Sequence, residues 1–219
     1  MRSLFFVTVL FSSSLALAQK GAADLSGTYA ANGANPGGEG KYSGEVKLTK
    51  SGDTYNVEWA LANSPPYKGV ALQSGELLGV GWGMGAAFGV VVYKVNGGKL
   101  SGRWATASSG PKAGTEELEG PPGLSGTYKI TKATTPDGKP YKGEVSITPN
   151  GDVYEVTWTL PKEKYSGVAI KQGELLIVGW GAADKAAGVV SYRVGANGME
   201  GVWGAPGSKQ LGTEKLLKK

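Results

Sequence analysis

The sequence predicts an all-β protein of two tandem antiparallel up-and-down meander modules, each with about eight strands that close into a small β-barrel. Three observations predict this fold class. The chain of 219 residues repeats itself at an offset of 98 or 99 residues, its apolar residues alternate with a period of two, and glycine-bearing turns separate the alternating stretches. Two facing sheets in a sandwich, or one larger merged barrel, remain alternatives.

The first eighteen residues have the pattern of a signal peptide. A positive charge at residue 2 precedes an apolar stretch from Leu4 to Leu17, and Ala16 and Ala18 provide the small residues that a signal peptidase recognises. A transmembrane helix would need ~20 apolar residues, and this stretch is shorter. We therefore expect cleavage near Ala18-Gln19 and a protein that is secreted, periplasmic or on the cell surface.

The remaining chain divides into β-module 1, residues 19–120, and β-module 2, residues 121–219. Two segments of the first module, YSGEVKLTKSGDTYNVEW (42–59) and YKGVALQSGELLGVGWG (67–83), are repeated in the second as YKGEVSITPNGDVYEVTW (141–158) and YSGVAIKQGELLIVGWG (165–181). All six tryptophans and all ten tyrosines have a counterpart in the other copy. The segment GPPG at 120–123 lies between the copies, where a short rigid linker is expected.

Within each module, the strands follow from the alternation. Tyr154, Val156, Trp158 and Leu160 share one face of a strand, which is typical of a sheet with one buried side. The same pattern, bounded by turns such as Ser51-Gly52, predicts strands at 25–30, 42–48, 54–61, 67–73, 76–82, 89–95, 100–106 and 114–118, with the second copy at the offsets above. Roughly eight strands suffice for a barrel whose interior holds side chains or one small ligand.

The composition argues against several functions. The chain has no Cys and no His, so it has no disulfide and lacks the commonest general base. The net charge of +5 comes from Lys residues scattered among Asp and Glu, so nucleic acid is not expected as a partner. No loop carries enough carboxylates for Ca²⁺, and neither a metal nor a cofactor is expected. Strands of about seven residues are too short to span a membrane, which takes ~9–11.

The aromatic residues are the strongest candidate feature. Their positions in the period-two alternation place most of them on the apolar face of the strands, so we expect most to form the core. A ligand pocket lined by them is the alternative. Glu116 and Glu214 have inward parity too, and we expect them to accept hydrogen bonds from strand-end amides. If there is a pocket, the predicted ligand-binding residues are Trp82, Trp104, Tyr93 and Glu116, with their counterparts Trp180, Trp203, Tyr192 and Glu214.

A set of repeated sequence motifs covers each module from end to end: GTY, YxGEVxIxxxGDxYxVxW, YxGVAI, LxVGWG, GVVxYxV, GxW and GTExL. In these motifs the chain resembles small exported bacterial β-repeat proteins that are labelled fibronectin-binding. The resemblance implies adhesion to the extracellular matrix, and it brings no defined binding residues. Avidin-like and lipocalin-like barrels are similar in strand count only.

We therefore expect an exported, non-catalytic binding protein. The first hypothesis is an extracellular macromolecule as partner, a fibronectin-like matrix protein or a glycan, with two similar sites that give avidity. The alternative is a carrier of a small apolar or aromatic ligand inside each barrel, which open pockets holding tryptophans would favour. A hydrolase is a third hypothesis, disfavoured because a nucleophile with its base is missing and because the possible carboxylate pair, Glu116 and Glu214, lies in different modules. The oligomeric state is left open.

Overall fold

The computed structural model describes residues 23–83, 87–182 and 187–219. The expected signal peptide, residues 1–18, lies outside the described residues. The described part of the first repeat contains one short 3₁₀ helix, η1 (Pro36–Gly38), and eight strands. These strands are β1 (Gly27–Ala34), β2 (Lys41–Ser51), β3 (Thr54–Leu61), β4 (Tyr67–Ser74), β5 (Leu77–Gly83), β6 (Phe88–Asn96), β7 (Lys99–Thr106) and β8 (Gly114–Glu119).

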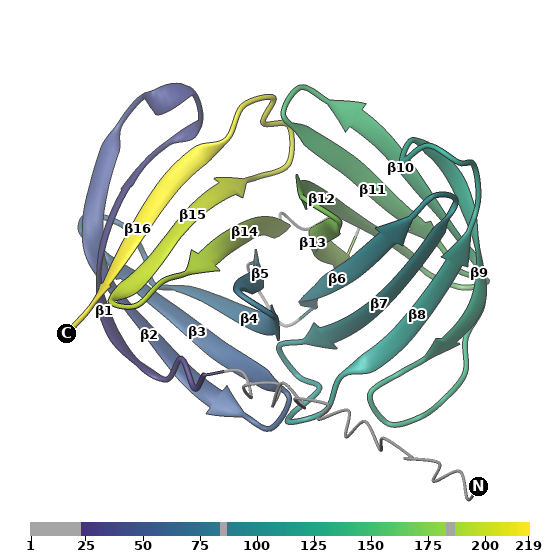
Figure 1. The fold of residues 1–219 in the computed structure, drawn as a ribbon, viewed down its shortest axis with the longest axis horizontal. Helices are drawn as coiled ribbons and strands as arrows, with labels where there is room; N and C mark the ends of the chain where they lie inside the picture. The colour runs from purple at the N-terminus through teal and green to yellow at the C-terminus, as the bar shows by residue number, and fades with distance from the viewer. Residues whose placement is uncertain (1–22, 84–86, 183–186) are drawn as a thin grey trace, which may run out of the picture.

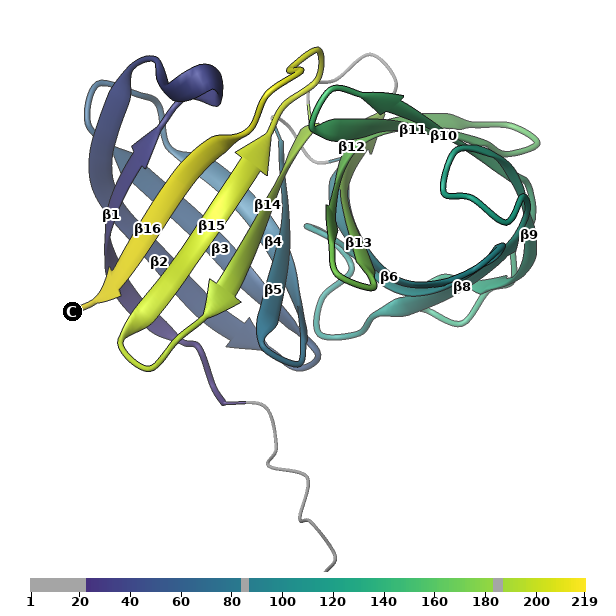
Figure 2. The same cartoon turned by 45° about the horizontal axis from the view of Figure 1, so that its top comes forward.

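The second repeat contains the matching strands. They are β9 (Gly126–Thr134), β10 (Glu144–Asn150), β11 (Val153–Thr159), β12 (Lys164–Gln172), β13 (Leu175–Ala182), β14 (Ala187–Val194), β15 (Gly198–Gly204) and β16 (Gly212–Lys218). All strand pairs are antiparallel, and the sixteen described strands form two closed barrels of eight (Figures 1 and 2). The predicted fold class is confirmed. Among the described residues, no helix is long and apolar enough to cross a membrane.

The barrels exchange strands between the repeats. The first barrel consists of β1–β5 closed by β14–β16, and the second barrel consists of β6–β13. The exchange occurs because β5 pairs with β14 and β13 pairs with β6. The division into residues 19–120 and 121–219 therefore follows the repeat in the sequence and not the barrels. The sequence does not reveal that the barrels differ from the repeats, since β6 and β14 carry nearly the same residues and can pair with the same kind of partner.

The two barrels pack against each other through strands that are buried on both faces. Outward residues of β4, β6, β12, β13 and β14 form a shared apolar cluster between the barrels, separate from the core inside each barrel. Figure 2 shows the second barrel nearly end-on while the first lies side-on, so the barrel axes point in different directions. Continuous apolar runs such as GVVV in β6 thus reflect burial on both faces of a strand.

Glycines allow the closest approach between the barrels. A Cβ on Gly81 would lie 1.9 Å from the carbonyl oxygen of Gly89, and a Cβ on Gly179 would lie 1.9 Å from that of Gly188. Any side chain at Gly81 or Gly179 would push the backbones of β5 and β6, or of β13 and β14, apart. Other strand glycines make room for aromatic rings, because Gly102 and Gly201 are covered by the rings of neighbouring tyrosines.

One end of each barrel is covered by the segment that precedes β1 in the first barrel or β9 in the second. In the first barrel, the hydroxyl of Tyr29 donates to the carbonyl oxygen of Leu25 over 2.7 Å, and the amide of Leu25 donates to the hydroxyl of Tyr55 over 3.3 Å. In the second barrel, the hydroxyl of Tyr128 donates to the carbonyl oxygen of Gly123. The opposite ends hold the candidate sites.

Candidate functional site

A cavity enters each barrel from the end where β3, β5 and β15, or their counterparts, finish. The cavity of the first barrel, here the first pocket, has a volume of about 220 Å³. The equivalent second pocket, in the second barrel, has about 190 Å³. Both are below the roughly 300–1,000 Å³ typical of sites for drug-sized ligands, so each suits a small molecule.

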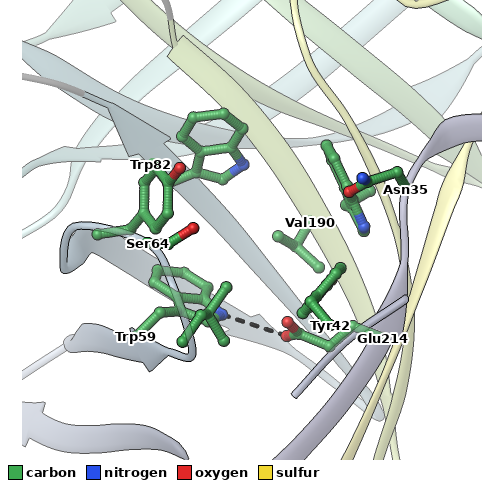
Figure 3. Close-up of a pocket in the computed structure, with 10 residues that line it drawn as sticks. Asn35, Tyr42, Trp59, Ser64, Trp82, Val190 and Glu214 are labelled. Carbon is green, nitrogen blue, oxygen red and sulfur yellow. Dashed lines mark hydrogen bonds between the residues drawn. The ribbon is translucent and has the colours of Figure 1, made fainter. Parts of the chain in front are cut away.

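Aromatic rings make the wall of the first pocket. Four half-buried rings follow one another edge to face: Tyr67 and Trp82 with centroids 5.8 Å apart, Trp82 and Trp203 at 6.5 Å, and Trp203 and Tyr42 at 6.5 Å. Edge-to-face contacts of this kind stabilise each ring's orientation. Trp59 completes the set at a deeper position, with 4% of its surface exposed. Figure 3 shows Tyr42, Trp59 and Trp82 around the open space.

The second pocket repeats this wall. Tyr165 and Trp180 have centroids 5.2 Å apart, Trp180 and Trp104 are 6.0 Å apart, and Trp104 and Tyr141 are 6.0 Å apart. Trp158 takes the deeper position. All six tryptophans of the chain therefore line the two pockets, three in each.

A buried glutamate lies at the base of the first pocket. Glu214, on β16, is 4% exposed, and its Oε2 accepts hydrogen bonds from the indole N–H of Trp59 over 3.2 Å and from the hydroxyl of Tyr192. The hydroxyl of Tyr42 donates over 3.5 Å to the backbone carbonyl of Thr213. Figure 3 shows the carboxylate directed toward Trp59. Among the described residues, no hydrogen bond to the other oxygen, Oε1, is present, although the nearby hydroxyl of Tyr42 favours the charged form of Glu214.

The glutamate of the second pocket is more completely bonded. Glu116, on β8, is 1% exposed, and its Oε2 accepts from the indole N–H of Trp158 over 3.3 Å and from the hydroxyl of Tyr93. Its Oε1 also accepts a hydrogen bond, over 2.7 Å, from the hydroxyl of Tyr141. The two pockets therefore share a framework and differ in whether the second carboxylate oxygen is used by the protein.

Burial governs the ionisation of these groups. Desolvation raises the pKa of Glu116 and of Glu214, and the tyrosine and tryptophan donors oppose the rise because they favour the charged carboxylate. Burial and the nearby carboxylates raise the pKa of Tyr93 and Tyr192 well above the usual range, so both remain neutral hydrogen-bond donors. At the edge of the second pocket, desolvation and Glu163 raise the pKa of Tyr165 to about 12.

Two indole N–H groups in the walls are buried and have no hydrogen-bond partner among the described residues. They belong to Trp104 and Trp203, which are counterparts in the two pockets. Each indole lies across a glycine of the next strand, since a Cβ on Gly114 or on Gly212 would lie 2.6 Å or 2.3 Å from the indole nitrogen. Gly114 and Gly212 therefore leave the room that the two indoles occupy.

The structure distributes the predicted site residues between the pockets by barrel, not by repeat. Trp82 lies with Trp203 and Glu214 in the first pocket. Trp180 lies with Trp104 and Glu116 in the second pocket. The two remaining predicted residues, Tyr93 and Tyr192, are fully buried beneath the pockets and bond the glutamates. Each pocket is thus assembled from both repeats.

The prediction that strand-end backbone amides donate hydrogen bonds to Glu116 and Glu214 was wrong. Backbone amides of a closed barrel are engaged in the strand ladders, so the inward carboxylates are bonded by phenol and indole groups instead. Sequence reasoning also left several wall residues out of the predicted site. A usable signal existed, because Tyr42, Tyr67 and Trp59 have inward parity near the ends of strands that meet at the pocket. The residues left out are Tyr42, Trp59, Leu61 and Tyr67, with Tyr141, Trp158, Leu160 and Tyr165.

The arrangement is suited to binding. Over residues 23–83, 87–182 and 187–219, no group of three or more His, Cys, Asp or Glu side chains could hold a metal ion. Glu116 and Glu214 lie in different barrels and line different cavities. They therefore do not flank a common substrate. What each pocket offers is aromatic surface, one buried carboxylate and an opening to solvent.

Comparison of the chain with protein-family models, with curated proteins and with solved structures finds no match.

Proposed function

We propose that this protein is an exported, non-catalytic binding protein that carries one small organic molecule in the pocket of each barrel. The observation that carries the proposal is the pair of open cavities of about 220 and 190 Å³, each lined by three tryptophans and a buried glutamate. A barrel interior needed only for stability would be filled by side chains. Half-exposed indoles around a cavity instead provide contact area for a ligand.

The two-barrel design gives the carrier two sites of related shape on one chain. Both pockets have three tryptophan rings, two tyrosine rings and a glutamate in corresponding positions. We therefore expect a stoichiometry of two ligands per chain. The hypothesis of a macromolecular partner, a matrix protein or a glycan, stays a prediction of the resemblance described above, and export after cleavage near Ala18-Gln19 belongs to this proposal as well.

Native mass spectrometry of the mature chain, purified without denaturation from the exported fraction, tests the proposal. We expect a mass increase from one or two bound molecules that is lost on unfolding. Leu61 and Leu160 are half-buried at the edges of the first and second pockets. Leu61→Trp and Leu160→Trp should each remove one of the two equivalents by filling a pocket.

The matched control is Leu217→Trp, which adds the same side chain at an exposed leucine outside both pockets. This variant should keep both equivalents. A bare chain mass that persists after incubation with the small-molecule extract of the producing cells would overturn the proposal. Equal loss of ligand in all three variants would also contradict it, because the ligand would then not lie in the pockets.

A further inference from the structure

We infer that each pocket binds a small organic cation, held by the aromatic ring faces and by the buried carboxylate of Glu214 or Glu116. The inference rests on the proposed function and names the chemical class of its ligand. It goes beyond the expectation of a generally apolar or aromatic ligand, because it follows from the charges that line the pockets and from the way the carboxylates are bonded.

The first step is the sign of the charge. Among the described residues that line the first pocket, the one charged side chain is Glu214. The corresponding residues of the second pocket carry two charges, Glu116 and Glu163, and both are negative. No Lys or Arg side chain of the described chain lines either cavity. An anionic ligand would therefore enter a region of negative potential with no counter-charge.

The second step is the aromatic wall. The faces of indole and phenol rings carry negative electrostatic potential, and tryptophan attracts a cation most strongly, within ≈ 6 Å of the ring centroid. Three tryptophans and two tyrosines surround each cavity. A purely apolar ligand would be served as well by Leu or Val, which are common in both cores. A cage of this composition distinguishes a cation from a neutral molecule of the same shape.

The third step is the buried carboxylate. An ionised side chain that is 96% or more buried is costly unless its lone pairs are bonded or a positive charge lies nearby. In the first pocket both hydrogen bonds reach Oε2 of Glu214, and Oε1 has no partner among the described residues. A cationic ligand supplies both the missing contact and the counter-charge. Burial raises the pKa of Glu214, and a bound cation would favour the ionised form.

Volume limits the size of the cation. Cavities of about 190–220 Å³ have room for a compact ammonium compound and exclude a long polyamine or a peptide. The edges differ, since Ser64 of the first pocket corresponds to Glu163 of the second. Glu163 accepts a hydrogen bond from Tyr165 over 2.7 Å, and its carboxylate is exposed at the opening. The second pocket should therefore favour cations more strongly than the first.

The test pairs each cation with a neutral molecule of nearly the same shape. The probes are choline with 3,3-dimethylbutan-1-ol, and 2-phenylethylammonium with 2-phenylethanol, titrated into the mature chain at neutral pH. Tryptophan fluorescence reports binding at the pockets, because all six tryptophans line them. We expect the cation of at least one pair to bind at least tenfold more tightly than its neutral partner, with calorimetry giving two sites per chain.

Variants assign the effect to the carboxylates. Glu214→Gln and Glu116→Gln should each abolish cation preference at one of the two sites and leave the other unchanged. The control is Glu200→Gln, at an exposed glutamate paired with Lys215 outside both pockets. It should change neither site. Far-ultraviolet circular dichroism and thermal unfolding confirm that each variant is folded before titration.

The outcomes separate this inference from the proposed function. Neutral probes that bind as tightly as the cations, or a neutral or anionic cargo found by native mass spectrometry, would overturn the cation inference while the carrier stands. A cationic cargo would support both. If no probe binds and the exported chain has its bare mass, both fail.

Discussion

The two pockets of this molecule have the same framework and differ in how the protein uses the carboxylate at the base. In the second pocket Tyr141 donates to Oε1 of Glu116 over 2.7 Å, whereas in the first pocket the corresponding Tyr42 donates to the backbone of Thr213 over 3.5 Å. Glu214 consequently keeps one oxygen without a protein donor. The comparison teaches that the rings and the glutamate define what kind of ligand fits, while a single tyrosine decides how much of the carboxylate remains for it.

A second lesson concerns assembly. Neither repeat builds a pocket alone, because Trp59 and Trp82 come from the first repeat while Trp203 and Glu214 of the same pocket come from the second. The reciprocal arrangement holds in the second pocket, where Trp104 and Glu116 come from the first repeat. A substitution of one pocket residue therefore changes the cavity of one barrel. The cavity of the other barrel stays as it was and serves as an internal reference.

The largest expected effect comes from locking the exchanged strands. Leu77 of β5 faces Arg193 of β14 in the ladder, and the corresponding pair in the second barrel is Leu175 with Lys94. If each repeat formed its own barrel, Leu77 would face Lys94 instead. The double variant Leu77→Cys/Arg193→Cys should oxidise to an intramolecular disulfide almost completely, because directly opposed strand residues lie within disulfide range.

The control for strand exchange is Leu77→Cys/Lys94→Cys, which should oxidise less than Leu77→Cys/Arg193→Cys, because β5 and β6 meet face to face between the barrels and are not paired in a ladder. The chain has no native cysteine, so no other disulfide competes. Mass spectrometry of peptides after digestion without reduction identifies the linked pair. Efficient linking of residue 77 to residue 94, with none to residue 193, would show that each repeat forms its own barrel. The pockets would then not be assembled from both repeats.

The next largest effect separates the two tyrosines. Removing the hydroxyl in Tyr141→Phe takes a donor from a buried carboxylate, and hydrogen bonds to charged groups contribute about 1.5–3 kcal/mol. Tyr42→Phe removes a long hydrogen bond to a backbone carbonyl and should cost less than about 1 kcal/mol. Urea unfolding at pH 8 measures both free energies. Equal losses in the two variants would mean that Tyr42 bonds Glu214 in solution as Tyr141 bonds Glu116.

How far the sequence predicts this molecule depends on what kind of interaction decides each feature. Strand positions were predictable because burial of one face imposes a period of two, as in Tyr154, Val156 and Trp158. Strand partners were not, because β6 and β14 offer nearly the same residues to β5.

The site was predictable in part for similar reasons. Parity placed Glu116 and Glu214 inside, and both are buried. Their actual donors depend on which strands stand next to each other around the barrel, and that is set by the exchange. Tyr42 and Tyr67 could have been included from parity, but whether an inward ring fills the core or lines a cavity depends on its distance from the barrel end.

The third effect is a pH dependence of stability that both pockets should share. The pKa of Glu116 and of Glu214 in the folded chain is raised above 4.5, the value in the unfolded chain. As the pH rises above 4.5 the unfolded chain loses these protons first, so the unfolded state binds fewer protons and the free energy of unfolding falls. The loss continues up to the folded pKa, and each pKa unit corresponds to about 1.4 kcal/mol.

Glutamine variants isolate this contribution from the surface carboxylates. The difference in free energy of unfolding between the native chain and Glu214→Gln should decrease from pH 4.5 toward pH 8, and likewise for Glu116→Gln. The two decreases should be similar in size, because Tyr42 beside Glu214 and Tyr141 beside Glu116 both favour the charged carboxylate. A difference that rises with pH would show that the donors outweigh burial and that the folded pKa is lowered.

The last expected effect lies at the contact between the barrels, where the repeats differ at several buried positions, one of which is Ser191 in place of Val92. Ser191 of β14 is 3% exposed and its hydroxyl has no hydrogen-bond partner among the described residues, while its counterpart Val92 of β6 belongs to the apolar cluster between the barrels. A buried hydroxyl without a partner costs about 1–3 kcal/mol. Ser191→Val should therefore raise the free energy of unfolding by about 1 kcal/mol, part of the gain being offset by repacking around the extra methyl group.

The reciprocal change, Val92→Ser, should lower the free energy of unfolding by about 1–3 kcal/mol, because it removes apolar contacts and buries a second hydroxyl. Urea unfolding at one pH measures both variants, and ligand titration should be unchanged in each, since neither residue lines a ligand pocket. If Ser191→Val destabilises the chain while Val92→Ser does so equally, the two positions are not equivalent in packing. Ser191 would then show that β14 and β6 pack differently against the opposite barrel. Because Val190 of β14 lines the first pocket and Val91 of β6 lines the second, the two pockets would differ in shape for the same reason.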